Sequence, residues 1–184
     1  MTRLRLDQKL VQLGQAPTRS QAESYIKLGY VSVDGKPVLK PGHFVGENSQ
    51  IKLIKLVKYV SRAGFKLESA NKIFNISFKD KIVLDVGSST GGFTEFALLH
   101  GAKKVVAVEV GTEQMHPKLR HDPKVELHEK TDIRNFKPHE TPDIVLIDVS
   151  FISLRQILPE IIKITGRDAQ IVAMLKPQFE AGSK

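Results

Sequence analysis

Several residue types and patterns are missing from this chain of 184 residues, and each absence narrows its chemistry. It contains no cysteine, which excludes disulfide bonds, a thiolate nucleophile and cysteine-ligated zinc, and is typical of a reducing compartment. No apolar run is long enough to span a bilayer, and the first residues, MTRLRLDQKL, do not resemble a signal peptide. We therefore expect a cytoplasmic protein without a membrane span, and we assign no metal ligands.

The net charge of +8 is unevenly distributed along the chain. Residues 1–60 hold ten Lys and Arg against four acidic residues, a net charge of +6, whereas residues 61–184 hold eighteen against sixteen, a net charge of +2. An anionic polymer is the natural partner for the first third of the chain, although such a surface can also serve only to keep a protein soluble.

The first third of the sequence predicts a small α+β module of two helices followed by a hairpin. Leucines at helical spacing within residues 6–13 predict the first helix. A capping box begins the second helix, with Thr18 as its N-cap and the Gln21 side chain reaching back to the backbone. Asp34 and Gly35, between alternating apolar residues, predict a two-residue hairpin turn.

Basic side chains of the two helices are spaced so that they could share one face, where fixed cations suit a phosphate backbone. The stretch RLDQKLVQLGQAPTRSQAESYIKLGYVSVDGKPVLKPG, residues 5–42, resembles an S4 RNA-binding domain. The resemblance implies that this module binds folded RNA with its helix pair; a generic basic helical domain is the alternative. The predicted RNA contacts are Arg3, Arg5, Lys9, Arg19, Lys27 and Arg62.

From Gly64 onwards, apolar runs alternate with amphipathic helical stretches. The first helix covers residues 64–76, with Phe65, Ala70, Ile73 and Phe74 as its candidate core face. The predicted strands are Ile82–Val86, Val105–Val110, Ile144–Val149 and Gln170–Leu175, with a weaker one at Val125–His128. The predicted helices between them are Phe93–His100, Gln114–Leu119 and Leu154–Ile164.

Continuous apolar strands between helices indicate an α/β fold, in which helices cover both faces of a parallel sheet. We therefore expect an S4-like module over residues 1–57, a basic linker over residues 58–63, and a Rossmann-like domain over residues 64–184.

The stretch LDVGSSTGGFTEFALLHGAKKVVAVEV, residues 84–110, predicts the ligand site of that domain. Asp85 ends the first strand and Glu109 the second, with a glycine-rich loop over residues 87–92 between them. In open α/β sheets, ligands bind outside the carboxyl ends of the strands, where Glu109 can accept both hydroxyls of a ribose.

The loop discriminates between cofactors. Its glycines follow G-x-x-x-G-G rather than the dinucleotide pattern G-x-G-x-x-G, and no Walker sequence occurs. S-adenosylmethionine has a cationic amino-acid end that suits Asp85, and Asp132 follows the third strand, where it could reach the adenine. We expect this cofactor; NAD and a ligand-free loop are the alternatives. The predicted cofactor contacts are Asp85, Gly87, Ser88, Ser89, Thr90, Gly91, Gly92, Phe93, Thr94, Glu109, Val110, Asp132 and Ile133.

The residues of the predicted active face limit which chemical group can accept the methyl group. Cytosine C5 methylation needs a cysteine nucleophile, and amino-group methylation commonly uses an [NDS]-P-P-[YFW] loop; neither is present. Lys66, Asp148 and Lys176 come instead from three predicted element ends. A ribose hydroxyl must lose its proton as it attacks, and a lysine kept neutral by a second cation can accept that proton.

The second module resembles the FtsJ-like methyltransferases, and the two modules in this order are similar to the TlyA family of hemolysins and ribosomal RNA methyltransferases. The matching stretches are YVSRAGFKLESA, DVGSSTGGFTEFAL, VVAVEVG, DIVLIDVSFISL and LKPQFE. The resemblance implies transfer from S-adenosylmethionine to the ribose 2′-hydroxyl of cytidine in the RNA of one or both ribosomal subunits. Lys66, Asp148 and Lys176 match the first three positions of the family's Lys–Asp–Lys–Glu catalytic set, and Glu109 stands where many relatives have Asp.

The chain departs from the family after its fifth predicted strand. The fold usually has seven strands, and Glu180 comes too early to match the fourth catalytic position. We therefore expect a shortened form of a longer enzyme, which binds RNA, retains at most weak cofactor binding and has little or no activity.

Two rival functions stay open. The chain could be a non-catalytic RNA-binding protein that keeps the sheet as a scaffold. It could also be a pore-forming hemolysin, although the sequence has no long apolar helix and its alternating β pattern is confined to one hairpin.

Overall fold

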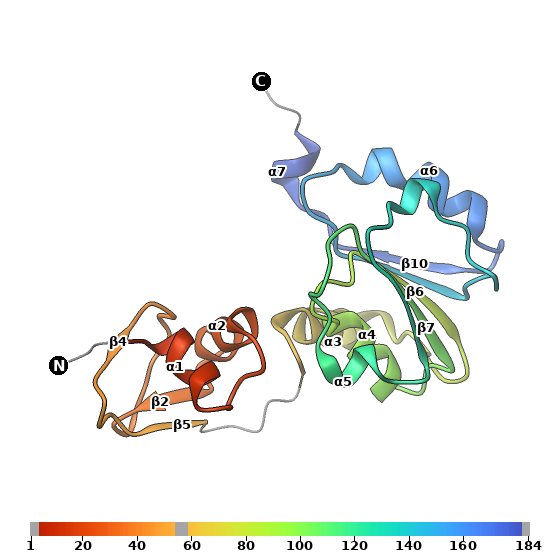
Figure 1. Cartoon of the computed structure of the whole chain (residues 1–184). Coiled ribbons are helices and arrows are strands. Elements are labelled where there is room, and N and C mark those ends of the chain that lie inside the picture. Colours follow the sequence, from red (N-terminus) through yellow and green to blue (C-terminus); the bar gives the residue numbers. More distant parts are fainter. Residues whose placement is uncertain (1–3, 54–58, 182–184) are drawn as a thin grey trace. The chain divides into compact units, whose positions relative to one another are not determined.

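The structure of the protein is a computed structural model that describes residues 4–53 and 59–181 (Figure 1). The chain divides into two compact units, residues 1–65 and residues 66–184, and each is described by itself. Residues 57 and 58, where the sequence analysis places the start of the linker, lie outside the described residues.

The first unit contains two helices and two small antiparallel sheets. Its elements are β1 (Leu4–Arg5), α1 (Leu6–Gln12), α2 (Arg19–Lys27), β2 (Val31–Val33), β3 (Lys36–Pro37), β4 (Phe44–Val45) and β5 (Ile51–Leu53). One sheet pairs β1 with β4, and the other has the order β3-β2-β5. The helices pack on each other through Leu6, Leu10, Ala22 and Ile26, all of which are fully buried.

Local sequence signals explain this unit well, with one exception. Asp34 and Gly35 both have positive φ, 50° and 80°, as a two-residue hairpin turn between β2 and β3 requires. The Thr18 hydroxyl accepts a hydrogen bond from the backbone N–H of Gln21 (3.3 Å), so the predicted N-cap of α2 is confirmed. The return half of the capping box is wrong, because the Gln21 side chain is buried and its amide has no partner among the described residues.

The second unit is an open α/β sheet. Its elements are α3 (Arg62–Phe74, which begins in the first unit), β6 (Ile82–Val86), α4 (Gly92–Leu99), β7 (Lys104–Val108), α5 (Pro117–Arg120), β8 (Val125–His128), the 3₁₀ helix η1 (Ile133–Asn135), β9 (Ile144–Ile147), α6 (Leu154–Ile164), β10 (Gln170–Ala173) and α7 (Pro177–Glu180). The five strands are parallel, in the order β10-β9-β6-β7-β8. The predicted parallel sheet is confirmed.

Helices cover both faces of this sheet (Figure 1). Side chains alternate across each strand, so Leu84 and Val86 of β6 pack in the cluster that includes Ile157 and Ile161 of α6. The opposite face lies toward α4, whose Thr94 bonds to Asp85 of β6. The strand order reverses between β6 and β9, and ligands of open α/β sheets bind at such a switch point.

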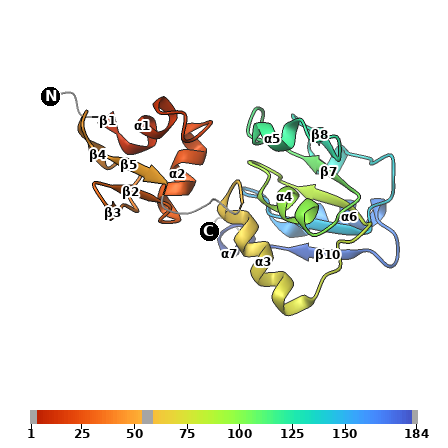
Figure 2. The same cartoon turned by 90° about the horizontal axis from the view of Figure 1, so that it is seen from below.

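Two predictions about helices are corrected. Ile73 and Phe74 of α3 are 73% and 66% exposed rather than core residues, because the last turn of α3 projects past the edge strand β10 (Figure 2). Helix α5 begins at Pro117 rather than Gln114, since proline favours the first helical turn and the His116 imidazole caps it.

The edge of the sheet at β10 is largely open in the described part of the chain. Ile171 is 37% exposed and Leu175, just after the strand, is 65% exposed. Strand β10 pairs with β9 alone among the described strands.

Candidate active site

Three side chains from separate elements meet beyond the carboxyl ends of the central strands. Asp148 directly follows β9, Lys176 follows β10, and Lys66 lies on α3. The Lys176 Nζ atom is 2.6 Å from Oδ1 of Asp148, and the Lys66 Nζ atom is 3.5 Å from Oδ2. The structure therefore brings together the three residues predicted to be catalytic, with one carboxylate between two amines.

Further contacts fix the positions of the two amines. Lys176 donates to the hydroxyl of Ser150 (3.0 Å) and its side chain is 19% exposed. Lys66 is 46% exposed and its Nζ lies 3.4 Å from the sulfur of Met174. Lys176 is thus held by two polar partners, whereas Lys66 is held more loosely and remains open to solvent.

Gly87 allows β6 to end close to Asp148. Its φ of +79° lies in the left-handed region, and a Cβ atom there would stand 3.0 Å from the carbonyl oxygen of Asp148. The backbone N–H of Asp148 donates to the carbonyl of Val86 (3.1 Å), which ties the ends of β9 and β6 together. Because any larger side chain would push these strand ends apart, the glycine controls where Asp148 lies.

Asp85 is a buried acid with an unused oxygen. Its side chain is 1% exposed, Oδ2 accepts a hydrogen bond from the Thr94 hydroxyl (2.6 Å), and Oδ1 has no partner among the described residues. Burial raises the pKa of Asp85 to about 7. A buried acceptor without a donor is costly, so this position fits a ligand that brings a cationic N–H group.

Glu109 connects the loops that follow β6 and β7. Its carboxylate is 8% exposed, Oε2 accepts the backbone N–H of Ser89 and Oε1 that of Gly111, both at 2.9 Å. Each carboxylate oxygen keeps a second lone pair, so Glu109 can still accept hydroxyl groups.

A pocket of about 540 Å³ opens at the switch point between β6 and β9, a volume that suits a small-molecule cofactor. Of the predicted site residues, those that line it are Gly87, Ser89, Glu109, Val110, Asp132, Ile133 and Asp148. The predicted cofactor residues outside its lining are Asp85, Ser88, Thr90, Gly91, Gly92, Phe93 and Thr94, which belong to the end of β6, the loop and the start of α4. The roles of both groups stay predictions.

Asp132 already has polar partners. It caps η1 by accepting the backbone N–H of Arg134 (2.9 Å), and the Arg134 guanidinium binds both carboxylate oxygens at 2.6–3.1 Å. The bonds from Arg134 lower the pKa of Asp132. The predicted contact with adenine would therefore use a remaining lone pair, beside the apolar wall that Ile133 provides.

Phe151, which no sequence pattern marks as a site residue, is the most exposed large apolar residue of the described chain. It is 92% exposed, lines the pocket, and has a φ of +67°, which is unusual for a bulky side chain. Its ring lies 5.4 Å from that of Phe179 on α7. A strained, solvent-facing aromatic residue three positions after Asp148 is a candidate contact for the substrate.

Glu180 forms hydrogen bonds that connect α7 to the beginning of α6. Its carboxylate accepts hydrogen bonds from the Ser153 hydroxyl (2.6 Å) and from the backbone N–H of Leu154 (2.8 Å), at the beginning of α6. The bond from Ser153 lowers the pKa of Glu180. The residue therefore connects α7 with α6 and the loop that carries Phe151.

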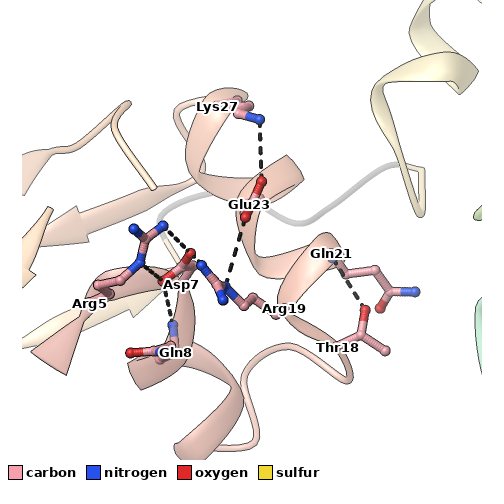
Figure 3. A network of polar contacts seen from close by, with 8 residues as sticks. All are labelled: Arg5, Asp7, Gln8, Thr18, Arg19, Gln21, Glu23 and Lys27. Carbon is pink, nitrogen blue, oxygen red and sulfur yellow. Dashed lines mark hydrogen bonds and ion pairs between the residues drawn. The ribbon is translucent and has the colours of Figure 1, made fainter. Parts of the chain in front are cut away.

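In the first unit, a polar network joins α1 and α2 (Figure 3). Arg5 and Arg19 both bind the buried carboxylate of Asp7, and Lys27 pairs with Glu23. Lys9 is partly exposed on α1 and Arg62 is exposed at the start of α3, whereas Arg3 lies outside the described residues. The sequence analysis did not anticipate Asp7.

Two other kinds of site are absent from the described ranges, 4–53 and 59–181. No group of three or more His, Asp or Glu side chains there is arranged to hold a metal ion. No helix within those ranges has the length and apolar character needed to cross a membrane.

The strand order, the glycine-rich loop and the pocket at the switch point define a Rossmann-like fold that binds a ligand at this edge of its sheet. Residues 59–184 match the FtsJ-like methyltransferase family and residues 4–51 match the S4 domain. The chain belongs to the FtsJ-like methyltransferase family and carries an N-terminal S4 domain.

Relatives match almost the whole chain. YqxC of Bacillus subtilis (strain 168) is 44% identical over 183 residues, which cover 97% of this chain and 65% of the relative. The 16S/23S rRNA (cytidine-2′-O)-methyltransferase TlyA of Mycobacterium tuberculosis (strain ATCC 25618 / H37Rv) is 41% identical over 185 residues, which cover 98% of this chain and 69% of the relative. The solved structure of a candidate hemolysin from Streptococcus thermophilus has a TM-score of 0.72 and 43% identity, and covers 99% of this chain and 69% of that one. The chain thus spans about two thirds of the length of these relatives.

Proposed function

We propose that this chain transfers a methyl group from S-adenosylmethionine to the ribose 2′-hydroxyl of a cytidine in ribosomal RNA. The observation that carries the proposal is the cluster of Lys66, Asp148 and Lys176 at the edge of the pocket. The family membership, the S4 domain and the printed activity of the TlyA relative support it. Such a reaction would take place in the cytoplasm.

The residues around the pocket fit the cofactor. Asp85 has an unused buried acceptor for a cationic amino group, and Glu109 has lone pairs for ribose hydroxyls. Val110 and Ile133 provide apolar surface for an adenine. When bound, the cofactor supplies a methyl group activated by a positively charged sulfur.

The catalytic cluster provides the proton acceptor. The 2′-hydroxyl must lose its proton as its oxygen attacks, and a lysine Nζ that is neutral at that moment accepts it. We assign this role to Lys176, because Asp148 and Ser150 both fix its position. Lys66 binds the other carboxylate oxygen and helps to hold Asp148 in place beside Lys176.

Phe151 has the properties of a platform for the target nucleotide. Its ring is exposed at the pocket, and a base can stack on an aromatic ring whatever its sequence context. Stacking would hold the base while its ribose lies beside Asp148.

Tritiated-methyl transfer to purified ribosomal subunits decides between this proposal and the expectation from the sequence that the chain has little or no activity. We expect label in RNA, recovered after nuclease digestion as 2′-O-methylcytidine, and a loss of at least a hundredfold in Lys176→Ala. Lys163→Ala is the matched control, since Lys163 is an exposed lysine of α6 that pairs only with Glu160 among the described residues. Label on a base atom, or none above the Lys176→Ala background, would contradict the proposal.

The same variants separate the two rival functions. A non-catalytic RNA-binding protein would bind subunits equally well as wild type, Lys66→Ala or Lys176→Ala, and would transfer no label in any form. For a hemolysin, dye release from liposomes would be the positive result; nothing in the described structure favours it.

A further inference from the structure

Asp7 is an acid buried within the most basic part of the chain. Its side chain is 0% exposed, although it lies in the first turn of α1 on a module predicted to bind RNA. Oδ1 accepts the Nε–H of Arg5 (3.1 Å) and the backbone N–H of Gln8 (2.9 Å). Oδ2 accepts Nη2–H of Arg5 (2.7 Å) and Nε–H of Arg19 (3.0 Å). Every bond to the carboxylate but one thus comes from an arginine.

The carboxylate holds two arginines from different elements side by side. Arg5 is the N-cap residue of α1 and Arg19 is the first residue of α2, so they come from the beginnings of two packed helices (Figure 3). Both guanidinium groups bind the same atom, Oδ2, which fixes them next to each other. Two cations would otherwise repel at this separation, and the negative charge between them allows the pair to form.

The two arginines keep part of their surface and donors for a further anion. Their side chains are 37% and 52% exposed, although their Nε atoms are directed to Asp7. Within the described structure, Nη1 of Arg5 and both Nη atoms of Arg19 donate no hydrogen bond to a protein group. A guanidinium held at Nε presents its remaining N–H groups in a fixed plane, which suits two oxygens of a phosphate.

A purely stabilising role would leave this arrangement unexplained. An acid in the first turn already interacts well with the helix N-terminus and needs no arginine for that purpose. The bonds from Arg5 lower the pKa of Asp7 to about 2, so the network does stabilise the folded unit. Apolar residues often replace a buried ion pair without loss of stability, so stability alone does not require two arginines here.

We propose that Asp7 is the positioning residue of an RNA phosphate clamp, in which it holds Arg5 and Arg19 with their free N–H groups toward one stretch of RNA backbone. The inference rests on the RNA-binding part of the proposed function and names the residue that organises the surface. Asp7 touches no RNA and acts through the two arginines. Its effect is on RNA affinity and not on the methyl-transfer step.

The Asp7→Asn substitution distinguishes the clamp from simple charge attraction, because the two predict opposite changes in RNA affinity. The substitution makes the chain more positive by one unit, so simple attraction to RNA predicts tighter binding. The clamp predicts weaker binding, because the two arginines lose the negative charge that orients them. Glu47→Gln is the matched control, since it adds the same charge to the same unit at an exposed side chain that pairs with neither arginine in the described structure.

The measurement is the equilibrium affinity of the full chain for purified, refolded 16S and 23S rRNA over a series of salt concentrations. We expect Asp7→Asn to bind about tenfold more weakly. Its slope of log K against log salt should also be smaller in magnitude, by the amount that roughly one to two phosphate contacts contribute. Glu47→Gln should bind as well as wild type or better. Equal or tighter binding by folded Asp7→Asn would overturn the inference.

Arginine-to-lysine variants keep the test decisive if Asp7→Asn does not fold. Arg5→Lys and Arg19→Lys preserve the charge and remove the planar fork, so the clamp predicts a loss of about fivefold or more in each. Unchanged affinity in both would show that charge alone matters and would overturn the inference.

The outcomes also separate this inference from the proposed reaction. RNA binding that falls in Asp7→Asn, together with no methyl transfer by any form, would leave the clamp standing and refute the enzyme. Methyl transfer and RNA affinity that are both unaffected by Asp7→Asn would refute the clamp and leave the enzyme standing. A wild-type chain that binds no rRNA would contradict both.

Discussion

The Nζ atom of Lys176 lies 2.6 Å from Oδ1 of Asp148, and the two residues follow adjacent parallel strands, β10 and β9. Parallel strands place their carboxyl ends at one edge of a sheet, so residues far apart in the chain meet there. The pair stands beside the pocket between β6 and β9, where Asp148 forms part of the wall. This relationship makes Asp148 the residue that connects the predicted base to the predicted cofactor site.

Lys66→Ala should reduce methyl transfer and leave RNA affinity unchanged. The Lys66 ammonium is 3.5 Å from Asp148, so its removal leaves Lys176 as the only cation on that carboxylate in the described structure. Asp148 then loses one of the two amines that fix its position, and the rate should fall by roughly tenfold to a hundredfold. Steady-state rates and RNA affinities of Lys66→Ala and wild type check the prediction, and equal rates would contradict it.

Gly87→Ala should displace Asp148 and weaken cofactor binding as well as the fold. The new Cβ meets the Asp148 carbonyl at 3.0 Å and the positive φ adds strain, for a loss of about 1–3 kcal/mol in the free energy of unfolding. Gly101→Ala is the control, because Gly101 has a φ of +91° but its nearest neighbour, the Cα atom of Lys79, would be 3.4 Å from the added atom. Thermal unfolding and calorimetric titration with S-adenosylmethionine measure the two effects. Equal cofactor affinity in both variants would contradict the role of Gly87.

The predictions from sequence succeeded where a local pattern determines the structure. The bounds of β6, β8 and α6 are the predicted ones, because apolar runs and helical periodicity there end at clear breaks. The exposure of Phe74 could not be predicted, since an amphipathic pattern does not reveal whether another element covers the helix. The prediction that the Gln21 side chain caps α2 was wrong for a related reason, because tertiary packing buries that side chain.

At the candidate site, residue types were predictable and their partners were not. The sequence places Asp148 and Lys176 after predicted strands, but where Lys66 lies relative to them depends on how α3 packs, which no local pattern shows. The positive φ and the exposure of Phe151 arise from a loop that packs on α7, so no local signal announces them. Asp7 looked like an ordinary acid of a helical first turn, because its burial depends on the approach of α2.

Phe151→Ala should impair methyl transfer with little effect on stability. The side chain is 92% exposed, so its loss removes little buried surface, whereas a lost stacking contact costs about tenfold or more in kcat/KM. Phe74→Ala removes a similarly exposed ring from α3 and should change neither quantity. Steady-state rates and thermal unfolding of both variants check the prediction; equal rates for Phe151→Ala and wild type would refute it.

Cofactor affinity should depend on pH through Asp85. Burial raises its pKa to about 7, so below that pH the side chain is increasingly neutral and loses its attraction for a cationic amino group. Calorimetric titration with S-adenosylmethionine should show affinity that falls by up to about tenfold per pH unit below pH 7 and levels off above it. A flat profile from pH 5.5 to 8.5 in the wild type would contradict the assignment.

Asp85→Asn should stabilise the fold at pH 8 while it weakens cofactor binding. Between the ordinary pKa of an Asp and about 7, the folded chain holds a proton that the unfolded chain has lost, so stability falls as the pH rises through that window. Asparagine removes the cost of the buried charge, and its carbonyl can still accept the Thr94 hydroxyl hydrogen bond. Chemical denaturation at pH 5 and pH 8 should show a stability gain for Asp85→Asn that is larger at pH 8. An equal gain at both pH values would show that Asp85 is ionised in the folded chain throughout this range, and would contradict the pH dependence expected of cofactor affinity.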